Sequence, residues 1–310
     1  ALVGNVRKTA ERADDWAAQE AARKGLQGKA KEAAGEKKLE NAGNLLMSLF
    51  AAANRPQGDP AKRLGTLRVV NELFRIYFKL NTLRNCKYLI RVVEAKKFVR
   101  FESFHPGDRV TYKFFVGRLA VFDENFTEAE AHLQYAFDKC TARARKNRRL
   151  ILKYLVPVKI LVGKLPSSEV LARHQLEGMY AAVAQAVRSG SVRGFETAVQ
   201  ERMEEYVRAG TFLLIEKLRM AVYRRLLKKV QRIHAELKPE RGAQLPLKYF
   251  VKALGWQGHA TDMDEVECIV ANMIYRGLVK GYVSHTSGVV VLSKKEPFPA
   301  LKSTMLDDPE

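Results

Sequence analysis

Cysteine is scarce in this chain of 310 residues, and closely spaced cysteine pairs do not occur at all. Cys86, Cys140 and Cys268 lie far apart, and no C-x-x-C motif is present. Structural zinc sites need such pairs, so we expect no zinc, no other cofactor and a reducing intracellular setting. No apolar run approaches the roughly 18 residues of a membrane-spanning helix, so we expect no membrane partner.

Signatures of the common enzyme classes are also missing. There is no G-x-x-x-x-G-K-[ST] phosphate-binding loop, no G-x-S-x-G and no H-E-x-x-H. The six histidines are scattered, and none lies at ligand spacing from a cysteine or a carboxylate. Asp262, Asp264 and Glu265 could suggest a metal site, but helix capping explains them more simply. We therefore expect neither a catalytic nor a metal site.

Acidic residues are too few to balance the basic ones. The chain has 54 Lys and Arg against 34 Asp and Glu, which gives a net charge of +20. A surplus of this size favours polyanionic partners: nucleic acid, acidic proteins or an anionic membrane. At 47% hydrophobic residues, the chain can still bury a large core, in two domains or in one extended repeat structure.

The stretch 247–292 has the pattern of a small module of two helices and a hairpin. Its first eight residues repeat apolar side chains at helical spacing, and glycines follow. Asp262 and Glu265 form a capping box that begins a second helix. Two β-rich runs, 278–285 and 289–292, flank a turn that contains glycine and predict a hairpin. This order is typical of a winged helix, which either binds nucleic acid or serves only as a dimerisation cap.

Helical periodicity continues almost without interruption through residues 61–240, with Gly and Pro at the joints. We predict long helices over 168–188, 192–209 and 211–237. Between Val116 and Ala136, small residues recur as in tetratricopeptide repeats, although the match is partial. The pattern predicts an array of stacked helices, an all-α repeat that resembles a TPR solenoid.

The remaining segments complete the predicted domain layout. We expect a winged helix over 241–300 and a tail over 301–310. Residues 1–60 begin with a part rich in Ala, Lys, Glu and Gly, where Gly25, Gly28, Gly35 and Gly43 interrupt any long helix. This part predicts weak, solvated helices or a partly mobile basic arm, and such an arm could contact RNA.

Two runs concentrate the positive charge without an intervening acid. The first run consists of Arg143, Arg145, Lys146, Arg148, Arg149 and Lys153. The second consists of Lys217, Arg219, Arg224, Arg225, Lys228, Lys229 and Arg232. In the second run the cations share the exposed side of one helix, whose apolar side extends to Ile233 and Leu237. A charge run is usually only a solvated face, but this one-sided excess favours contact with phosphates.

Several separated motifs resemble one protein family. The motifs are Tyr154-Leu-Val-Pro157-Val-Lys159, Gly163-x-Leu-Pro166, Leu214-Ile-Glu216-Lys-Leu218, Tyr223-Arg224, Asp264-Glu-Val-Glu-Cys268-Ile-Val-Ala-Asn272-Met-Ile-Tyr275, Gly281-Tyr-Val-Ser-His285 and Ser293-Lys-x-x-Pro297-Phe298-Pro299. In this order they are similar to the PCI-domain subunits of the TREX-2 transcription-export complex, and the fungal signalosome-subunit-twelve-like proteins share much of the pattern.

The resemblance implies a PCI domain, in which helical repeats end in a winged helix. It implies a large scaffold subunit with its own PCI domain and a small, acidic, mostly disordered subunit as partners. It also implies RNA or DNA bound without sequence specificity across paired winged helices. The implied role couples transcription to mRNA export, in the nucleus or at the nuclear pore.

The resemblance also directs the choice of candidate residues. The scaffold contact would use the winged-helix edge, formed by the helix 265–275 and the hairpin. Tyr282 of the hairpin is a candidate for partner binding; it could instead stack on a base or pack across the strands. The polar side of the helix 265–275 is acidic, so we place nucleic-acid binding on nearby cations. These cations are Arg224, Arg225, Lys228, Lys229, Arg276, Lys280, His285, Lys294 and Lys295.

The acidic subunit would need a basic groove, which the first run could supply by its charge alone. The candidates for this contact are Arg143, Arg145, Lys146, Arg148 and Arg149, and RNA is the rival ligand of the same residues.

Two functions remain open. One is a non-catalytic subunit of a nuclear mRNA-export complex that binds its scaffold and nucleic acid. The other is a protein-only scaffold subunit of a PCI-type complex, associated with the signalosome or with splicing.

Overall fold

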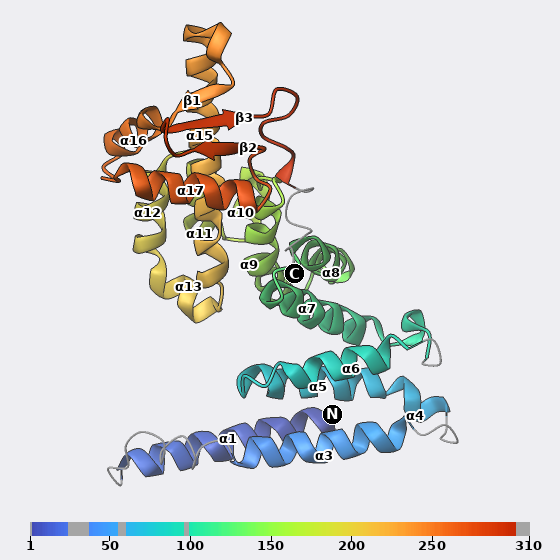
Figure 1. The fold of residues 1–310 in the computed structure, drawn as a ribbon. Helices are drawn as coiled ribbons and strands as arrows, with labels where there is room; N and C mark the ends of the chain where they lie inside the picture. The colour runs from blue at the N-terminus through green and yellow to red at the C-terminus, as the bar shows by residue number, and fades with distance from the viewer. Residues whose placement is uncertain (1, 24–36, 55–59, 96–98, 302–310) are drawn as a thin grey trace. The chain divides into compact units, whose positions relative to one another are not determined.

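The computed structural model describes residues 2–23, 37–54, 60–95 and 99–301. They belong to two compact units, the first formed by residues 1–119 and 138–140, the second by residues 120–137 and 141–310. Both units are helical, and the second ends in one small antiparallel sheet (Figure 1). The predicted fold class, a helical array that ends in a winged helix, is confirmed.

The first unit is built around α5. Its helices are α1 (Leu2–Arg23), α3 (Lys37–Ala53), α4 (Pro60–Leu64), α5 (Thr66–Lys79), α6 (Arg84–Val93) and most of α7 (Pro106–Phe122), with a 3-10 turn η1 (Phe101–Ser103) before α7. Helix α5 packs on α1, α3, α4 and α6. Its apolar face, from Leu67 to Tyr77, is buried as the periodicity predicts, and Phe74 stacks on Tyr112 of α7 with ring centroids 5.8 Å apart.

The described residues of the N-terminal segment form two packed helices, where weak helices or a mobile arm were expected. Leu46 and Phe50 of α3 are fully buried. The carboxylate of Asp14 in α1 accepts hydrogen bonds from the backbone N–H groups of Lys38 and Leu39 and so fixes the start of α3. Because α3 packs on α5, residues before and after position 60 share one unit. The predicted interruptions at 25, 28 and 35 lie outside the described residues, whereas Gly43 lies within α3 and does not interrupt it.

The second unit stacks short helices. These are α8 (Phe126–Lys139), α9 (Arg145–Leu161), α10 (Ser168–Arg173), α11 (Glu177–Ser189), α12 (Val192–Glu201), α13 (Met203–Ala209), α14 (Phe212–Glu216) and α15 (Leu218–Leu237). The three long helices predicted between 168 and 237 are each broken, at Gln175, Arg202 and Lys217. Gln175 has a φ of +55°, a left-handed conformation that ends a helix and that apolar periodicity does not reveal.

Buried tyrosines join these helices through their hydroxyl groups. Tyr154 donates a hydrogen bond to the carbonyl oxygen of Ala209 at 2.8 Å, and Tyr180 donates to that of Lys153 at 2.7 Å. Burial raises the pKa of Tyr180, so its hydroxyl stays protonated and remains a donor. Each bond satisfies a buried polar atom and ties together two elements that are distant in sequence.

The C-terminal module has the predicted winged-helix order with one additional strand. It contains β1 (Gln244–Pro246), α16 (Leu247–Trp256), α17 (Met263–Tyr275), β2 (Gly281–Ser284) and β3 (Val289–Leu292), after a 3-10 turn η2 (Pro239–Arg241). The sheet has the order β1-β3-β2 and lies beside α16 and α17 (Figure 1). The predicted cap is confirmed, because Asp262 accepts a hydrogen bond from the N–H of Glu265 at 2.8 Å.

Helix α15 belongs both to the helical repeats and to the winged helix. It packs on α9, α11 and α12 and also on α16 and η2. Its close approach to α11 depends on Gly190, which ends α11 with a φ of +70°. A Cβ at Gly190 would lie 2.8 Å from the backbone nitrogen of Leu226 in α15.

We expect G190A to lower the free energy of unfolding by about 2–5 kcal/mol. A left-handed Cβ costs ~1–2 kcal/mol, and the collision with the α15 backbone adds ~1–3 kcal/mol. Gly258 supplies the control, since its φ is +80° and none of the described residues lies within 4 Å of the place that a Cβ would take there. G258A should cost only ~1–2 kcal/mol in the same urea titration. Equal losses in the two variants would show that the contact between α11 and α15 is not the constraint.

Candidate nucleic-acid and partner surfaces

One face of α15 carries most of the second basic run. We define the α15 basic face as the four exposed cations Arg225, Lys228, Lys229 and Arg232. Among the residues that the structure describes, Lys228 and Lys229 form no ion pair with a carboxylate. Arg232 lies 3.8 Å from Glu236, an exposed pair of the kind that contributes little to stability. The charge of this face is therefore largely uncompensated within the described protein.

The pKa of Lys228 is lowered on this face. Partial burial lowers this pKa, and the neighbouring Arg224, Arg225 and Arg232 lower it further by repulsion. An anion that approached the face would relieve this repulsion. The α15 basic face is thus suited to bind phosphates.

Arg224, one of the cations predicted to contact nucleic acid, forms hydrogen bonds within the protein. Its half-buried guanidinium donates hydrogen bonds to the carbonyl oxygens of Leu278 and Pro299. It also lies 5.8 Å from the ring centroid of Phe298. Burial lowers the pKa of Arg224, which is the cost of holding a cation in this position. Arg224 thereby holds the C-terminal segment against α15.

Helix α17 occupies the place of a recognition helix but exposes acids. Val266, Val270 and Met273 are buried, as their spacing predicts, whereas Asp264 and Glu265 are exposed. Carboxylates repel phosphates, so this helix is unsuited to lie along a nucleic-acid backbone.

Two of the predicted cations near the hairpin are paired with acids. Lys280 lies 2.9 Å from Glu296, and His285 lies 2.7 Å from Glu267. The hydrogen bond with Glu267 raises the pKa of the exposed His285. A phosphate would have to compete with these carboxylates, so Lys280 and His285 are weaker candidates than the α15 basic face.

The other predicted residues of the winged helix are exposed. Lys294 and Lys295 lie in the segment that Arg224 holds in place, and Arg276 lies just after α17. Tyr282 of β2 faces Val291 of β3 in the sheet register and is 62% exposed, which leaves its ring available to a partner.

The first basic run lies around the start of α9. Arg145, Lys146, Arg148 and Arg149 line one cavity there, and Arg143 is exposed in the turn before the helix. The structure therefore brings together four of the five residues that were predicted to bind an acidic partner.

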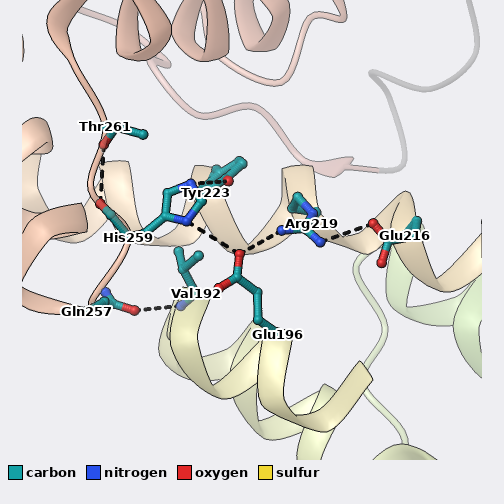
Figure 2. A network of polar contacts seen from close by, with 8 residues as sticks. All are labelled: Val192, Glu196, Glu216, Arg219, Tyr223, Gln257, His259 and Thr261. Carbon is teal, nitrogen blue, oxygen red and sulfur yellow. Dashed lines mark hydrogen bonds and ion pairs between the residues drawn. The ribbon is translucent and has the colours of Figure 1, made fainter. Parts of the chain in front are cut away.

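A polar network attaches the loop between α16 and α17 to the helical repeats (Figure 2). Glu196 of α12 accepts a hydrogen bond from Arg219 of α15 at 2.8 Å and lies 3.4 Å from the Nδ1 atom of His259. Gln257 accepts a hydrogen bond from the backbone N–H of Val192. The sequence does not reveal this network, because its members come from separate elements and form no motif.

An apolar groove lies between the last turns of α15 and α16. Its volume is about 220 Å³. Its most exposed apolar side chains are Trp256, at 86%, Leu237, at 77%, and Ile233, at 57%. Lys238 and Lys252 also line it. The spacing of Ile233 and Leu237 predicts that they lie on the apolar side of their helix. Leu227 is the last buried apolar side chain of α15, however, and these two are exposed.

Within the described ranges, no group of three or more His, Cys, Asp or Glu side chains is placed to hold a metal ion. Nor does any helix among the described residues have the length and apolarity to span a membrane.

Comparisons with known proteins agree with this architecture. Residues 200–294 match the model of the PCI domain family. The chain is 44% identical over 264 residues to Enhanced ethylene response protein 5 of Arabidopsis thaliana, covering 85% of this chain and 63% of that protein. It is 41% identical over 282 residues to PCI domain-containing protein 2 of Danio rerio, covering 90% of this chain and 68% of that protein.

A third relative is the Protein CSN12 homolog of Gibberella zeae, 33% identical over 255 residues, which cover 78% of this chain and 56% of that protein. The chain thus spans about two thirds or less of the length of these relatives.

We expect R224A to destabilise the second unit by about 2–4 kcal/mol, because two carbonyl oxygens lose a charged donor and become unsatisfied. Hydrogen exchange in residues 278–299 should accelerate as the segment detaches from α15. The control K229A removes an exposed cation from the same helix and should change stability by about 0.5 kcal/mol or less. If R224A leaves stability and hydrogen exchange unchanged but weakens RNA binding, Arg224 contacts nucleic acid as the sequence predicted.

Proposed function

The chain belongs to the PCI domain-containing protein 2 family, and from this premise we propose that it is a non-catalytic subunit of a nuclear mRNA-export complex that binds RNA or DNA through the α15 basic face. The family places it among subunits of PCI-type scaffold complexes. The resemblance of its motifs to the TREX-2 subunits supports the role in export and the nuclear location.

One observation carries the nucleic-acid part of the proposal: exposed cations are stacked on α15, largely without carboxylate partners among the described residues. Arg225, Lys228, Lys229 and Arg232 recur at helical spacing over two turns, about 10 Å of helix. Lys and Arg that contact phosphates position a nucleic acid but do not distinguish its bases. Binding is therefore proposed to be non-specific in sequence and strongly dependent on salt.

The acids of α17 refine this proposal. In most helix-turn-helix modules the second helix enters the major groove. Asp264 and Glu265 oppose that geometry here, whereas α15 offers cations on the adjoining part of the fold. We therefore propose that the backbone of the nucleic acid follows α15 and the exposed Lys294 and Lys295, and that no base is read from α17.

The salt dependence of RNA binding tests this site directly. K228A/K229A should lower the slope of log K against log salt concentration by about two, because each phosphate contact contributes about one unit. The measurement is fluorescence anisotropy of a labelled single-stranded RNA across a salt series, first with the chain alone and then with the scaffold subunit bound.

R84A/R91A is the matched control, since it removes two exposed cations from α6 in the first unit. It should leave the slope unchanged. Equal effects of the two double variants would mean that net charge, rather than the α15 basic face, drives binding. Loss of all RNA binding when the scaffold subunit joins would favour the protein-only alternative.

The second candidate function is a protein-only scaffold subunit, and the apolar groove favours it. Exposed Trp, Leu and Ile side chains in a groove are typical of a protein interface. Lys238 and Lys252 in the lining would suit a partner segment with acids beside its apolar side chains. We propose that such a segment of the large scaffold subunit binds here. This position on α16 differs from the winged-helix edge at α17 and the hairpin that the sequence predicted.

We expect W256A to weaken binding of the large scaffold subunit by about 2 kcal/mol or more, as loss of a buried tryptophan anchor does. L213A removes another exposed apolar side chain, on α14, and should bind normally. The measurement is a calorimetric titration of the wild-type chain and of each variant with the scaffold subunit. Equal affinity of the W256A and L213A proteins, measured by calorimetry, would place the contact elsewhere.

A further inference from the structure

The cavity at the start of α9 is lined mainly by basic side chains. Its volume is about 670 Å³, within the common size range of small-ligand sites. Its lining consists of Ala142, Arg145, Lys146, Arg148, Arg149, Arg173, His174 and Gln175. Five of these eight side chains are Arg or Lys, so the cavity is a concave surface of concentrated positive charge.

The fold holds two of its guanidinium groups in place. Arg148 lies 4.0 Å from the ring centroid of Phe137 and donates a hydrogen bond to that residue's carbonyl oxygen at 3.2 Å. Arg149 donates to the carbonyl oxygen of Gln175 at 3.1 Å. Gln175 itself has the left-handed backbone that ends α10 and turns the chain toward α11. Donors held in this way lose less freedom when they bind a ligand.

The lining of the cavity contains no acidic side chain. Arg173 pairs with Glu169 at 3.0 Å, but both side chains are exposed. The first turn of α9 contains no acid, so the positive end of its dipole adds to the same field. Burial lowers the pKa of His174, and the charges of Arg148 and Arg173 lower it further.

We propose that this cavity binds a compact polyphosphate, a small soluble ligand with several phosphate groups close together. Guanidinium groups donate paired hydrogen bonds to phosphate oxygens, and several converge here. The ligand would supply the negative charge that the lining of the cavity lacks.

The same lining argues against a protein segment, the partner that the sequence predicted for these residues. Protein interfaces depend on apolar and aromatic anchors in pockets, and Ala142 is the single apolar side chain in this lining. The apolar groove beside Trp256 has the opposite chemistry. A polyphosphate therefore fits the cavity better than an acidic polypeptide.

Calorimetric titration of the whole chain with inorganic tripolyphosphate tests the proposal. We expect one ligand per chain at physiological salt, and binding of sulfate at matched ionic strength that is weaker by about tenfold or more. R145A/K146A should weaken tripolyphosphate binding by about tenfold or more, because it removes two charged donors. Arg145 and Lys146 are exposed, so this variant should keep the melting temperature of the wild type.

R84A/R91A is the control for charge, because it removes two exposed cations from α6 and should bind tripolyphosphate normally. Equal weakening in the two double variants would overturn the proposal in favour of general attraction. So would displacement of tripolyphosphate by a poly-glutamate peptide at comparable concentration. Retained tripolyphosphate affinity with lost RNA binding in R145A/K146A would identify the cavity as an RNA contact instead. The RNA salt slope of K228A/K229A decides the proposed function separately.

Discussion

The packing of α15 against two different sets of neighbours is the constraint on which the second unit depends. The buried side chains of this helix, such as Val222 and Leu227, serve the helical repeats, and its later turns contact α16. Gly190 allows the backbones of α11 and α15 to approach closely. Because the apolar side must face these neighbours, the basic residues are left on the remaining side. The charged surface of α15 is thus a consequence of its packing.

The same packing also determines where the apolar side of α15 becomes exposed to solvent. The repeats bury this side as far as Leu227, and α16 covers only part of the last turns of α15. Ile233 and Leu237 remain exposed beside Trp256, although their spacing continues the buried pattern. A helix that serves two subdomains can therefore carry both a core and an interface on one continuous stripe.

Three surfaces of the second unit differ in chemistry. The α15 basic face is exposed and convex, as the side of a helix is. The groove at Trp256 is apolar, and the cavity at α9 is concave and lined by cations. A long polyanion needs charge along a line. An apolar protein segment needs apolar anchors, and a compact polyphosphate needs converging donors. Their separation would allow one subunit to engage several ligands at the same time.

Local patterns in the sequence determined the helical class, the winged-helix order, the cap at Asp262 and the location of the basic runs. These features depend on neighbours within a few residues, so periodicity and spacing reveal them. Strand β1 escaped detection because its three residues, which include Pro246, are strand only through pairing with β3. Arg224 and Lys228 lie one turn apart on α15, yet only Lys228 is exposed. Carbonyl oxygens 54 and 75 residues further along the chain bind Arg224. The tertiary structure alone decided which cations face solvent, because the partners that bury a charge come from distant parts of the chain.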